Sequence, residues 1–99
     1  MTQCMPFQKV KTFRSEKYKA WVKEQDCCRC LAPADDPHHL IGIGNMGGTG
    51  TKAPDSMIMP MCRKCHNEIH AQPELWPDQW EHIARTIKKA FEAGVIEVV

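Results

Sequence analysis

Two short cysteine motifs constrain this chain more strongly than any other feature of its sequence. They are Cys27-x-x-Cys30 and Cys62-x-x-Cys65, and 31 residues separate them. A structural zinc ion takes four ligands at tetrahedral positions, with sulfur at about 2.3 Å, and each motif supplies two sulfurs from one compact turn. We therefore expect these four cysteines to hold structural Zn²⁺. A thioredoxin-like redox pair would need a βαβ unit around the motif, and the sequence pattern predicts none.

The size of the chain makes this zinc site important for folding. A chain of 99 residues forms one domain and buries a modest core. Structural zinc binds with about 10–16 kcal/mol, which is comparable to or larger than the folding energy of a small domain. We therefore expect zinc to be a condition of folding. The other two cysteines, Cys4 and Cys28, are expected to be free thiols, because Cys28 has the wrong spacing from Cys30.

The N-terminal residues contain no basic stretch followed by an apolar core, so we expect no signal peptide and a cytoplasmic location. In that reducing compartment, cysteine motifs bind metal more often than they form disulfides. No apolar run approaches the roughly 20 residues that would span a bilayer, so no membrane association is expected.

The hydrophobic pattern predicts an α+β fold, mostly helical around a small hairpin. Ser15 is the expected N-cap of a first helix, and Asp78 and Gly94 are expected to begin and end the last one. The glycine-rich stretch 42–50 predicts a loop, and 95–99 an extended tail. The expected helices are 15–25, 62–71 and 78–93, and the expected strands are 38–41 and 56–61. The apolar face of the last helix is predicted to be Trp80, Ile83, Ala84, Ile87 and Phe91.

Four histidines fall within or beside the zinc motifs. His66 and His70 are four residues apart on the predicted helix, so their side chains point the same way. His38 and His39 are neighbours on a predicted strand and point to opposite faces. One of that pair can bind a metal with His66 and His70, while the other stays free as a base with a pKa near 6.5. Three imidazoles and an open position suit a divalent ion that contacts phosphate, which indicates phosphodiester hydrolysis. The remaining histidine, His82, is expected to be an ordinary surface or core residue.

These motifs together resemble those of the HNH endonucleases of the ββα-metal superfamily. The stretches that carry the resemblance are Cys27-x-x-Cys30, Asp36-Pro37-His38-His39-Leu40-Ile41-Gly42 and Cys62-Arg63-Lys64-Cys65-His66-Asn67-Glu68-Ile69-His70. Residues 35–42, the loop 47–52 and Asp55 are especially similar to the phage recombination-enhancement (Ref-type) nucleases and related prophage proteins. The resemblance covers about residues 15–72. It implies a zinc-stabilised ββα-metal (His-Me finger) core with flanking N- and C-terminal helices.

The resemblance also implies a role for each histidine. His39 would be the general base, and His38 would replace the metal-binding Asp or His of the family. His66 and His70 would be metal ligands on the helix. The catalytic ion would be Mg²⁺, Mn²⁺, Ni²⁺ or Zn²⁺.

The sequence departs from the family at the Asn in the middle of the HNH motif, because no residue of this chain stands at its usual place. Asp55, Ser56 or Asn45 could orient His39 instead, and Asp55 is our candidate for the catalytic set.

DNA is the partner that this resemblance implies, although the chain has a net charge of only +1. That charge excludes binding by bulk positive charge alone, although residues 1–25 carry six Lys or Arg and two Glu. Arg63 and Lys64 at the helix start, and Lys52 in the glycine-rich loop, are the predicted DNA contacts, with solvated side chains as the alternative.

The expected organisation is one nuclease domain over 1–99, with a basic arm and helix (1–25), a zinc-framed ββα core (26–72) and a C-terminal helix and tail (73–99). The resemblance further implies phage or prophage recombination, in which a recombinase filament could be a partner. Two alternatives stay open. One is a non-catalytic zinc module that binds DNA or protein, and the other is a structural protein with two zinc ions. Trp76 and Trp80 could contact such a partner or belong to the core. The sequence does not indicate an oligomeric state.

Overall fold

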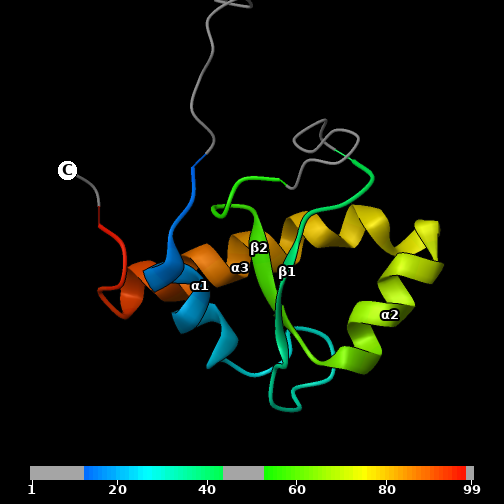
Figure 1. The fold of residues 1–99 in the computed structure, drawn as a ribbon, viewed down its shortest axis with the longest axis horizontal. Helices are drawn as coiled ribbons and strands as arrows, with labels where there is room; N and C mark the ends of the chain where they lie inside the picture. Colours follow the sequence, from blue (N-terminus) through cyan, green and yellow to red (C-terminus); the bar gives the residue numbers. More distant parts are fainter. Residues whose placement is uncertain (1–12, 44–52, 98–99) are drawn as a thin grey trace, which may run out of the picture.

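The structure is a computed structural model that describes residues 13–43 and 53–97. It is a small α+β domain, as the hydrophobic pattern predicts (Figure 1). The elements in chain order are α1 (Glu16–Lys23), β1 (Asp36–His39), β2 (Ile58–Met61), α2 (Arg63–Ala71), the 3₁₀ helix η1 (Pro73–Asp78) and α3 (Gln79–Glu92). The assignment of 1–99 to a single domain stays a prediction, since three segments of the chain lie outside the described residues.

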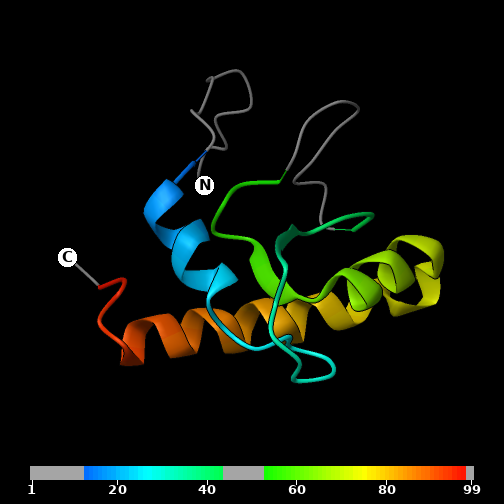
Figure 2. The same cartoon turned by 60° about the horizontal axis from the view of Figure 1, so that its bottom comes forward.

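The two strands form an antiparallel pair at the centre of the domain. His38 lies opposite Met59 in the register, and His39 lies opposite Ile58. Helices α1 and α2 flank this pair on opposite sides, and α3 runs beneath it along the length of the domain (Figure 2). Each strand therefore has helices on both sides, and the histidines of β1 lie between α1 and α2.

The helices begin where local capping groups allow. Ser15 caps α1, because its hydroxyl accepts a hydrogen bond from the Tyr18 backbone N–H at 3.1 Å. Cys62 caps α2, and its sulfur accepts from the Cys65 N–H at 3.5 Å. The expected N-cap Asp78 makes no such bond, because the chain enters α3 already helical from η1. Sequence patterns did not predict η1, which begins at Pro73, where a missing N–H is harmless.

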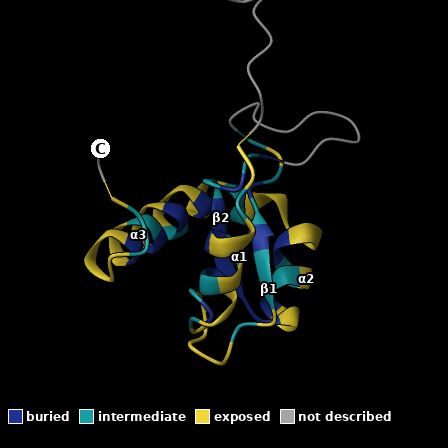
Figure 3. Cartoon of the chain, turned by 60° about the vertical axis from the view of Figure 1, so that its left-hand side comes forward, coloured by how far each residue is buried: buried dark blue, intermediate teal, exposed yellow. Residues whose placement is uncertain are grey.

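Strand β2 lies between two hydrophobic clusters and packs against both. All four of its residues are buried (Figure 3). Met59 and Met61 pack with the cysteines and with Ile69 of α2, whereas Ile58 packs with Tyr18 of α1 on the other side. One short strand thus joins the core around the cysteines to the core under α1.

The predicted apolar face of α3 is wrong in part. The buried residues of this helix are Gln79, Ile83, Thr86 and Ala90. Trp80 and Phe91 are instead 41% and 45% exposed, and Ala84 is exposed too. The reason is that small side chains at positions 86 and 90 let α3 lie close to β2, while Gln79 makes hydrogen bonds that only a buried position offers. Hydropathy alone predicts neither effect.

The expected extended tail after α3 also differs from the structure. Gly94 takes φ +74°, a conformation that ends the helix, and the chain then turns back. The Val95 N–H donates to the Ala90 carbonyl at 2.9 Å. Val95 and Ile96 consequently pack against the cluster that contains Tyr18.

Candidate metal centres and active site

The four cysteines predicted to bind zinc converge in the structure. Their Sγ atoms all lie within 4.8 Å of one another, and the distance between Cys30 Sγ and Cys62 Sγ is 3.6 Å. Sulfurs at 2.3 Å from a tetrahedral ion would be about 3.8 Å apart. The donor set and its spacing therefore indicate a structural zinc site.

Backbone hydrogen bonds shape the first cysteine turn. The Arg29 N–H donates to Cys27 Sγ at 3.5 Å, and the Cys28 N–H donates to the Pro60 carbonyl at 2.9 Å, which fastens the turn to β2. Leu31 completes the turn with φ +67°. Burial disfavours the thiolate of Cys27, but backbone N–H groups outweigh this and lower the pKa of Cys27 to about 6. A thiolate is the form that binds zinc.

The two remaining cysteines differ in what the structure says of them. The Cys28 sulfur is not among the converging four, and burial raises the pKa of Cys28 to about 12. It therefore stays a thiol at neutral pH. Cys4 lies outside the described residues.

A second group of metal-ligating side chains lies beside the cysteines. His38 of β1 and the two histidines of α2 offer ring nitrogens within 4.8 Å of one another. The ring centroid of His38 is 4.7 Å from that of His66 and 5.4 Å from that of His70. The three residues run from buried through half-buried to exposed, in the order His38, His66, His70. The group is therefore open to solvent on one side.

Two of the three histidine rings are kept in the form that binds a metal. Burial lowers the pKa of His38 to about 4, and burial also lowers the pKa of His70. Both rings are consequently neutral at pH 7, with a lone pair available.

Neighbouring groups also fix which nitrogen is available. His38 Nε2 lies 3.2 Å from Gln79 Oε1, and His66 Nδ1 lies 3.2 Å from Asp36 Oδ2. Because both oxygens act as acceptors, the ring nitrogens donate, which leaves His38 Nδ1 and His66 Nε2 with free lone pairs. Partners of this kind orient metal-binding histidines in proteins.

Gln79 is the residue on which this arrangement depends, and sequence reasoning missed it. It is fully buried, and its Nε2 donates to the carbonyls of Ile41 and Trp76 at 2.8 and 3.0 Å. Its Oε1 accepts from the Ile41 N–H at 3.0 Å and from His38. The signal was present in the sequence, because Gln79 lies four residues before the buried Ile83 on the inner face of α3.

His39 points away from the three converging histidines, as adjacent strand positions require. Its Nε2 lies 2.8 Å from Oδ1 of Asp55, a carboxylate that is only 1% exposed. The other oxygen of Asp55 accepts from the Ser15 N–H at 2.7 Å. Burial would raise the pKa of Asp55, but the bonds from His39 and Ser15 outweigh this and lower it. The carboxylate is therefore ionised and accepts the His39 Nε2–H, which leaves Nδ1 of His39 as the proton acceptor.

Of the two candidates for orienting His39 that the structure describes, Asp55 is the one in contact with its ring. Ser56 lies instead on the wall of a different cavity, and Asn45 is outside the described residues.

All four histidines line one pocket of about 350 Å³. It lies beside β1, and its walls are Lys19, Asp36, Pro37, His38, His39, Ile41, His66 and His70. The three converging histidines and His39 therefore line a common space, although His38 and His39 point to opposite faces of the strand, and Asp55 contacts His39 without being part of this lining.

The predicted DNA contacts are only partly placed. Arg63 Nε lies 3.0 Å from Asp36 Oδ2, so its guanidinium already has a carboxylate partner at the edge of the pocket. Lys64 is exposed on the first turn of α2, and Lys52 lies outside the described residues. His82 is half-buried on α3 and does not line the pocket.

The chain leaves β1 through a tightly packed turn. Gly42 has φ +76°, and a Cβ at this position would overlap the ring of Trp76. The Trp76 Nε1–H donates to the Ile69 carbonyl at 2.9 Å, which ties η1 to α2. Trp76 therefore supports the wall of the pocket, as the core alternative predicted, whereas Trp80 is largely exposed.

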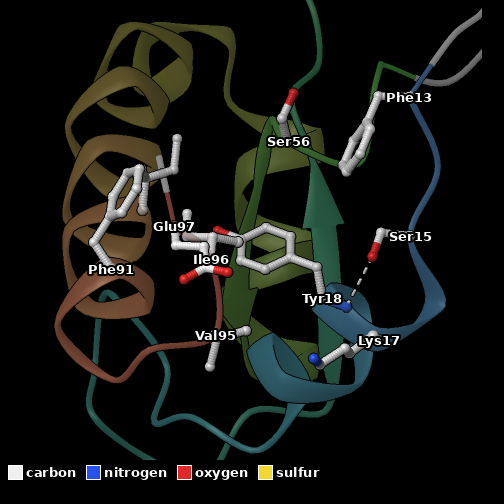
Figure 4. Close-up of a pocket in the computed structure, with 10 residues that line it drawn as sticks. Phe13, Ser15, Lys17, Tyr18, Ser56, Phe91, Val95, Ile96 and Glu97 are labelled. Carbon is white, nitrogen blue, oxygen red and sulfur yellow. Dashed lines mark hydrogen bonds between the residues drawn. The ribbon is translucent and has the colours of Figure 1, made fainter. Parts of the chain in front are cut away.

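A second cavity, of about 330 Å³, is mainly apolar and lies between α1, α3 and the C-terminal turn (Figure 4). Phe13 and Phe91 stand on its walls, and the ring of Tyr18 projects into it. The buried Tyr18 hydroxyl has no hydrogen-bond partner among the described residues. No histidine or cysteine of the described chain lines this cavity, so it offers no metal ligands of those types.

Comparison with known proteins places the chain in a family. Residues 2–94 match the family described as "Protein of unknown function (DUF968)", and the chain therefore belongs to this family. It is 47% identical over 96 residues to the Escherichia coli K12 protein YdfU, which is described as uncharacterized. The match covers 93% of this chain and 27% of YdfU, so the chain spans about a quarter of that relative's length. No solved structure matches. Within residues 13–43 and 53–97, no helix is long and apolar enough to cross a membrane.

Proposed function

We propose that this member of the DUF968 family is a metal-dependent DNA endonuclease of the HNH (ββα-metal) type. One observation carries the proposal: three histidines that could hold a metal ion converge in a pocket that His39 also lines, and the His39 ring bonds to the Asp55 carboxylate. A metal site that only stabilises a fold has no need of an additional oriented base.

The order of the elements supports the same proposal. Strands β1 and β2 pair antiparallel and α2 follows directly, which is the ββα order of the superfamily that the motifs resemble. The cysteine cluster fixes the start of α2, so His66 and His70 follow it at fixed positions. The resemblance to Ref-type nucleases adds the proposal of a role in phage or prophage DNA recombination in the cytoplasm, with a recombinase filament as a candidate partner.

His38, His66 and His70 would hold the catalytic ion, and the neutral rings of His38 and His70 fit a divalent metal. Imidazole ligands suit Zn²⁺, Ni²⁺ and Mn²⁺ better than Mg²⁺, which prefers oxygen. When bound, such an ion would supply a Lewis acid that stabilises negative charge on the phosphate and on the departing oxygen.

The protein's own part in the reaction falls to His39. Its Nδ1 carries a free lone pair and would take a proton from water as that water attacks phosphorus. Asp55 accepts the Nε2–H at 2.8 Å, so it keeps the ring in the required tautomer and stabilises the imidazolium that forms. The Ser15 N–H in turn holds Asp55, which makes the start of α1 part of the support for the base.

Cleavage of supercoiled plasmid DNA tests this proposal. Wild-type protein with Mg²⁺, Mn²⁺, Ni²⁺ or EDTA is compared with His39→Ala and with the matched control His82→Ala. We expect metal-dependent nicking by the wild type and by His82→Ala, and a rate lower by about 10²–10⁴-fold in His39→Ala, the usual contribution of a general base. Far-UV circular dichroism checks that both variants are folded. Equal cleavage by wild type and folded His39→Ala would exclude the assigned base.

A non-catalytic zinc module that binds DNA or protein is the second candidate. The observation that favours it is the apolar cavity with its unpartnered Tyr18 hydroxyl, a feature that the nuclease proposal does not use. This candidate predicts no metal-dependent nicking by any variant, with DNA or protein binding that is unchanged in His39→Ala.

A further inference from the structure

One lysine faces the histidine pocket from the side opposite α2. Lys19, in the middle of α1, is the one lysine or arginine among the described residues that line this pocket. Its side chain is 28% exposed, so it is partly covered but still reaches solvent. Helices α1 and α2 flank the strands on opposite sides (Figure 1), and Lys19 lines the pocket from α1 whereas His66 and His70 line it from α2.

The charge of Lys19 is only weakly engaged by the protein. Its Nζ lies 2.9 Å from Glu16 Oε1, one turn earlier on α1, and the Glu16 side chain is 90% exposed. Exposed ion pairs of this kind contribute little, because water competes and two long side chains must be ordered. The ammonium group can therefore exchange this partner for another anion at small cost.

Arg63, another cation near the pocket, is held differently. Its guanidinium contacts both oxygens of Asp36, which also bonds to His66. Moving Arg63 to a substrate would leave that carboxylate without its cation. Lys19 is thus the better placed of the two to meet a new negative charge in the pocket.

Lys19 also lies close enough to the His39–Asp55 pair to influence the pKa of Asp55. Its positive charge helps to keep the pKa of Asp55 low, after the larger effects of burial and of the bonds from His39 and Ser15. An anion bound by Lys19 would consequently lie near the His39 ring.

We propose that Lys19 binds a non-bridging oxygen of the scissile phosphodiester, so that the nucleic-acid backbone lies across β1 between α1 and α2. This inference rests on the proposed nuclease function, and it adds the substrate's position and a substrate-contacting residue. An ammonium group at this place would attract the phosphate in the ground state and stabilise the additional charge of the transition state.

Matched lysine variants of α1 test the proposal. Lys19→Gln is compared with Lys23→Gln, which removes the same charge one turn further along the same helix, at an exposed position outside the pocket. We expect kcat/KM for plasmid nicking to fall about 10- to 100-fold in Lys19→Gln, the effect of losing a charge-assisted hydrogen bond, and about 2-fold or less in Lys23→Gln. Lys19→Arg should recover most of the loss. Equal rates in Lys19→Gln and Lys23→Gln would overturn the proposal.

A binding measurement separates this inference from the nuclease function. Fluorescence anisotropy of a labelled DNA duplex is followed in the His39→Ala background, where the substrate is not cleaved. Lys19→Gln should weaken binding and reduce the salt slope by about 1, as expected for one lost phosphate contact. Glu16→Gln should leave binding unchanged or strengthen it, because it removes the competing carboxylate.

Selective loss of DNA binding in Lys19→Gln, without nicking by the wild type, would support the phosphate contact and refute the catalytic role of His39. Nicking that depends on His39, with identical DNA binding in Lys19→Gln and Lys23→Gln, would support the nuclease and refute the contact.

Discussion

Helix α2 contributes to two groups of side chains that could hold a metal ion, and the two groups differ in construction. The cysteine group combines Cys62 and Cys65, at the start of the helix, with two ligands from the turn before β1, and three of its four residues are buried. The histidine group combines His66 and His70 of the same helix with His38, and its members run from buried to exposed. Four sulfurs complete a tetrahedral ion, whereas three nitrogens leave a position free.

The difference teaches how a short chain can combine stability with an accessible site. The cysteine group lies in the core cluster that α2 shares with β2 and brings the turn before β1 to the start of α2, and its ligands are held by backbone N–H groups. The histidine group instead depends on two side-chain partners, Gln79 and Asp36. These partners can be substituted without removing any contact of the cysteine group. We therefore expect substitutions in the two groups to have different consequences.

The largest expected effect is on the cysteine group. Cys65→Ser removes one zinc ligand, and the loss of a site that contributes about 10–16 kcal/mol exceeds what a domain of this size can tolerate. The variant should lose its helical circular dichroism and its bound zinc at 25 °C, as should the wild type after prolonged treatment with a strong chelator.

Cys28→Ser is the matched control, because Cys28 lies in the same turn but outside the converging sulfurs. It should keep its zinc and a cooperative thermal transition. A Cys65→Ser protein that melts like the wild type would show that the cysteine group does not support the fold.

A smaller loss of stability is expected from a substitution at the point where the histidine group joins the core. Gln79→Leu removes the acceptor for the buried His38 and both partners of the half-buried Ile41 backbone. Leaving such groups unsatisfied should lower the free energy of unfolding by about 2–4 kcal/mol. Urea denaturation of zinc-loaded protein measures this change, with Gln72→Leu as an exposed control.

Gln79→Leu should also affect the two metal groups differently. It should weaken metal binding by the histidines by about 10- to 100-fold, while the cysteine group keeps its zinc. A variant as stable as the wild type would mean that Gln79 does not carry the His38 contact in solution.

Sequence patterns predicted the parts of this fold that short-range spacing determines. The Ser15 cap, both strands and the helix that starts after Cys62 depend on neighbouring residues, and the structure contains all of them, although β1 spans Asp36–His39 and not the expected 38–41. The opposite directions of His38 and His39 follow from strand geometry alone.

What the sequence did not predict depends on contacts between distant segments. Gln79 meets His38 across 41 residues, and Lys19 of α1 reaches a pocket whose other walls come from β1 and α2. The buried face of α3 was misassigned for the same reason, because its fit to β2 decides which side chains are covered. Asp55 was one of three candidates for orienting His39, and only the fold brings it to that ring.

The central claim, that α2 carries one closed and one open metal site, is tested most directly by counting bound ions. Native mass spectrometry of protein loaded with excess Zn²⁺ and then exchanged into metal-free buffer compares the wild type with His70→Ala. His70 is exposed, so its removal should leave the fold intact. We predict two zinc ions in the wild type and one in the folded variant. A single ion in both proteins, or the loss of both ions and of the fold in His70→Ala, would contradict the account.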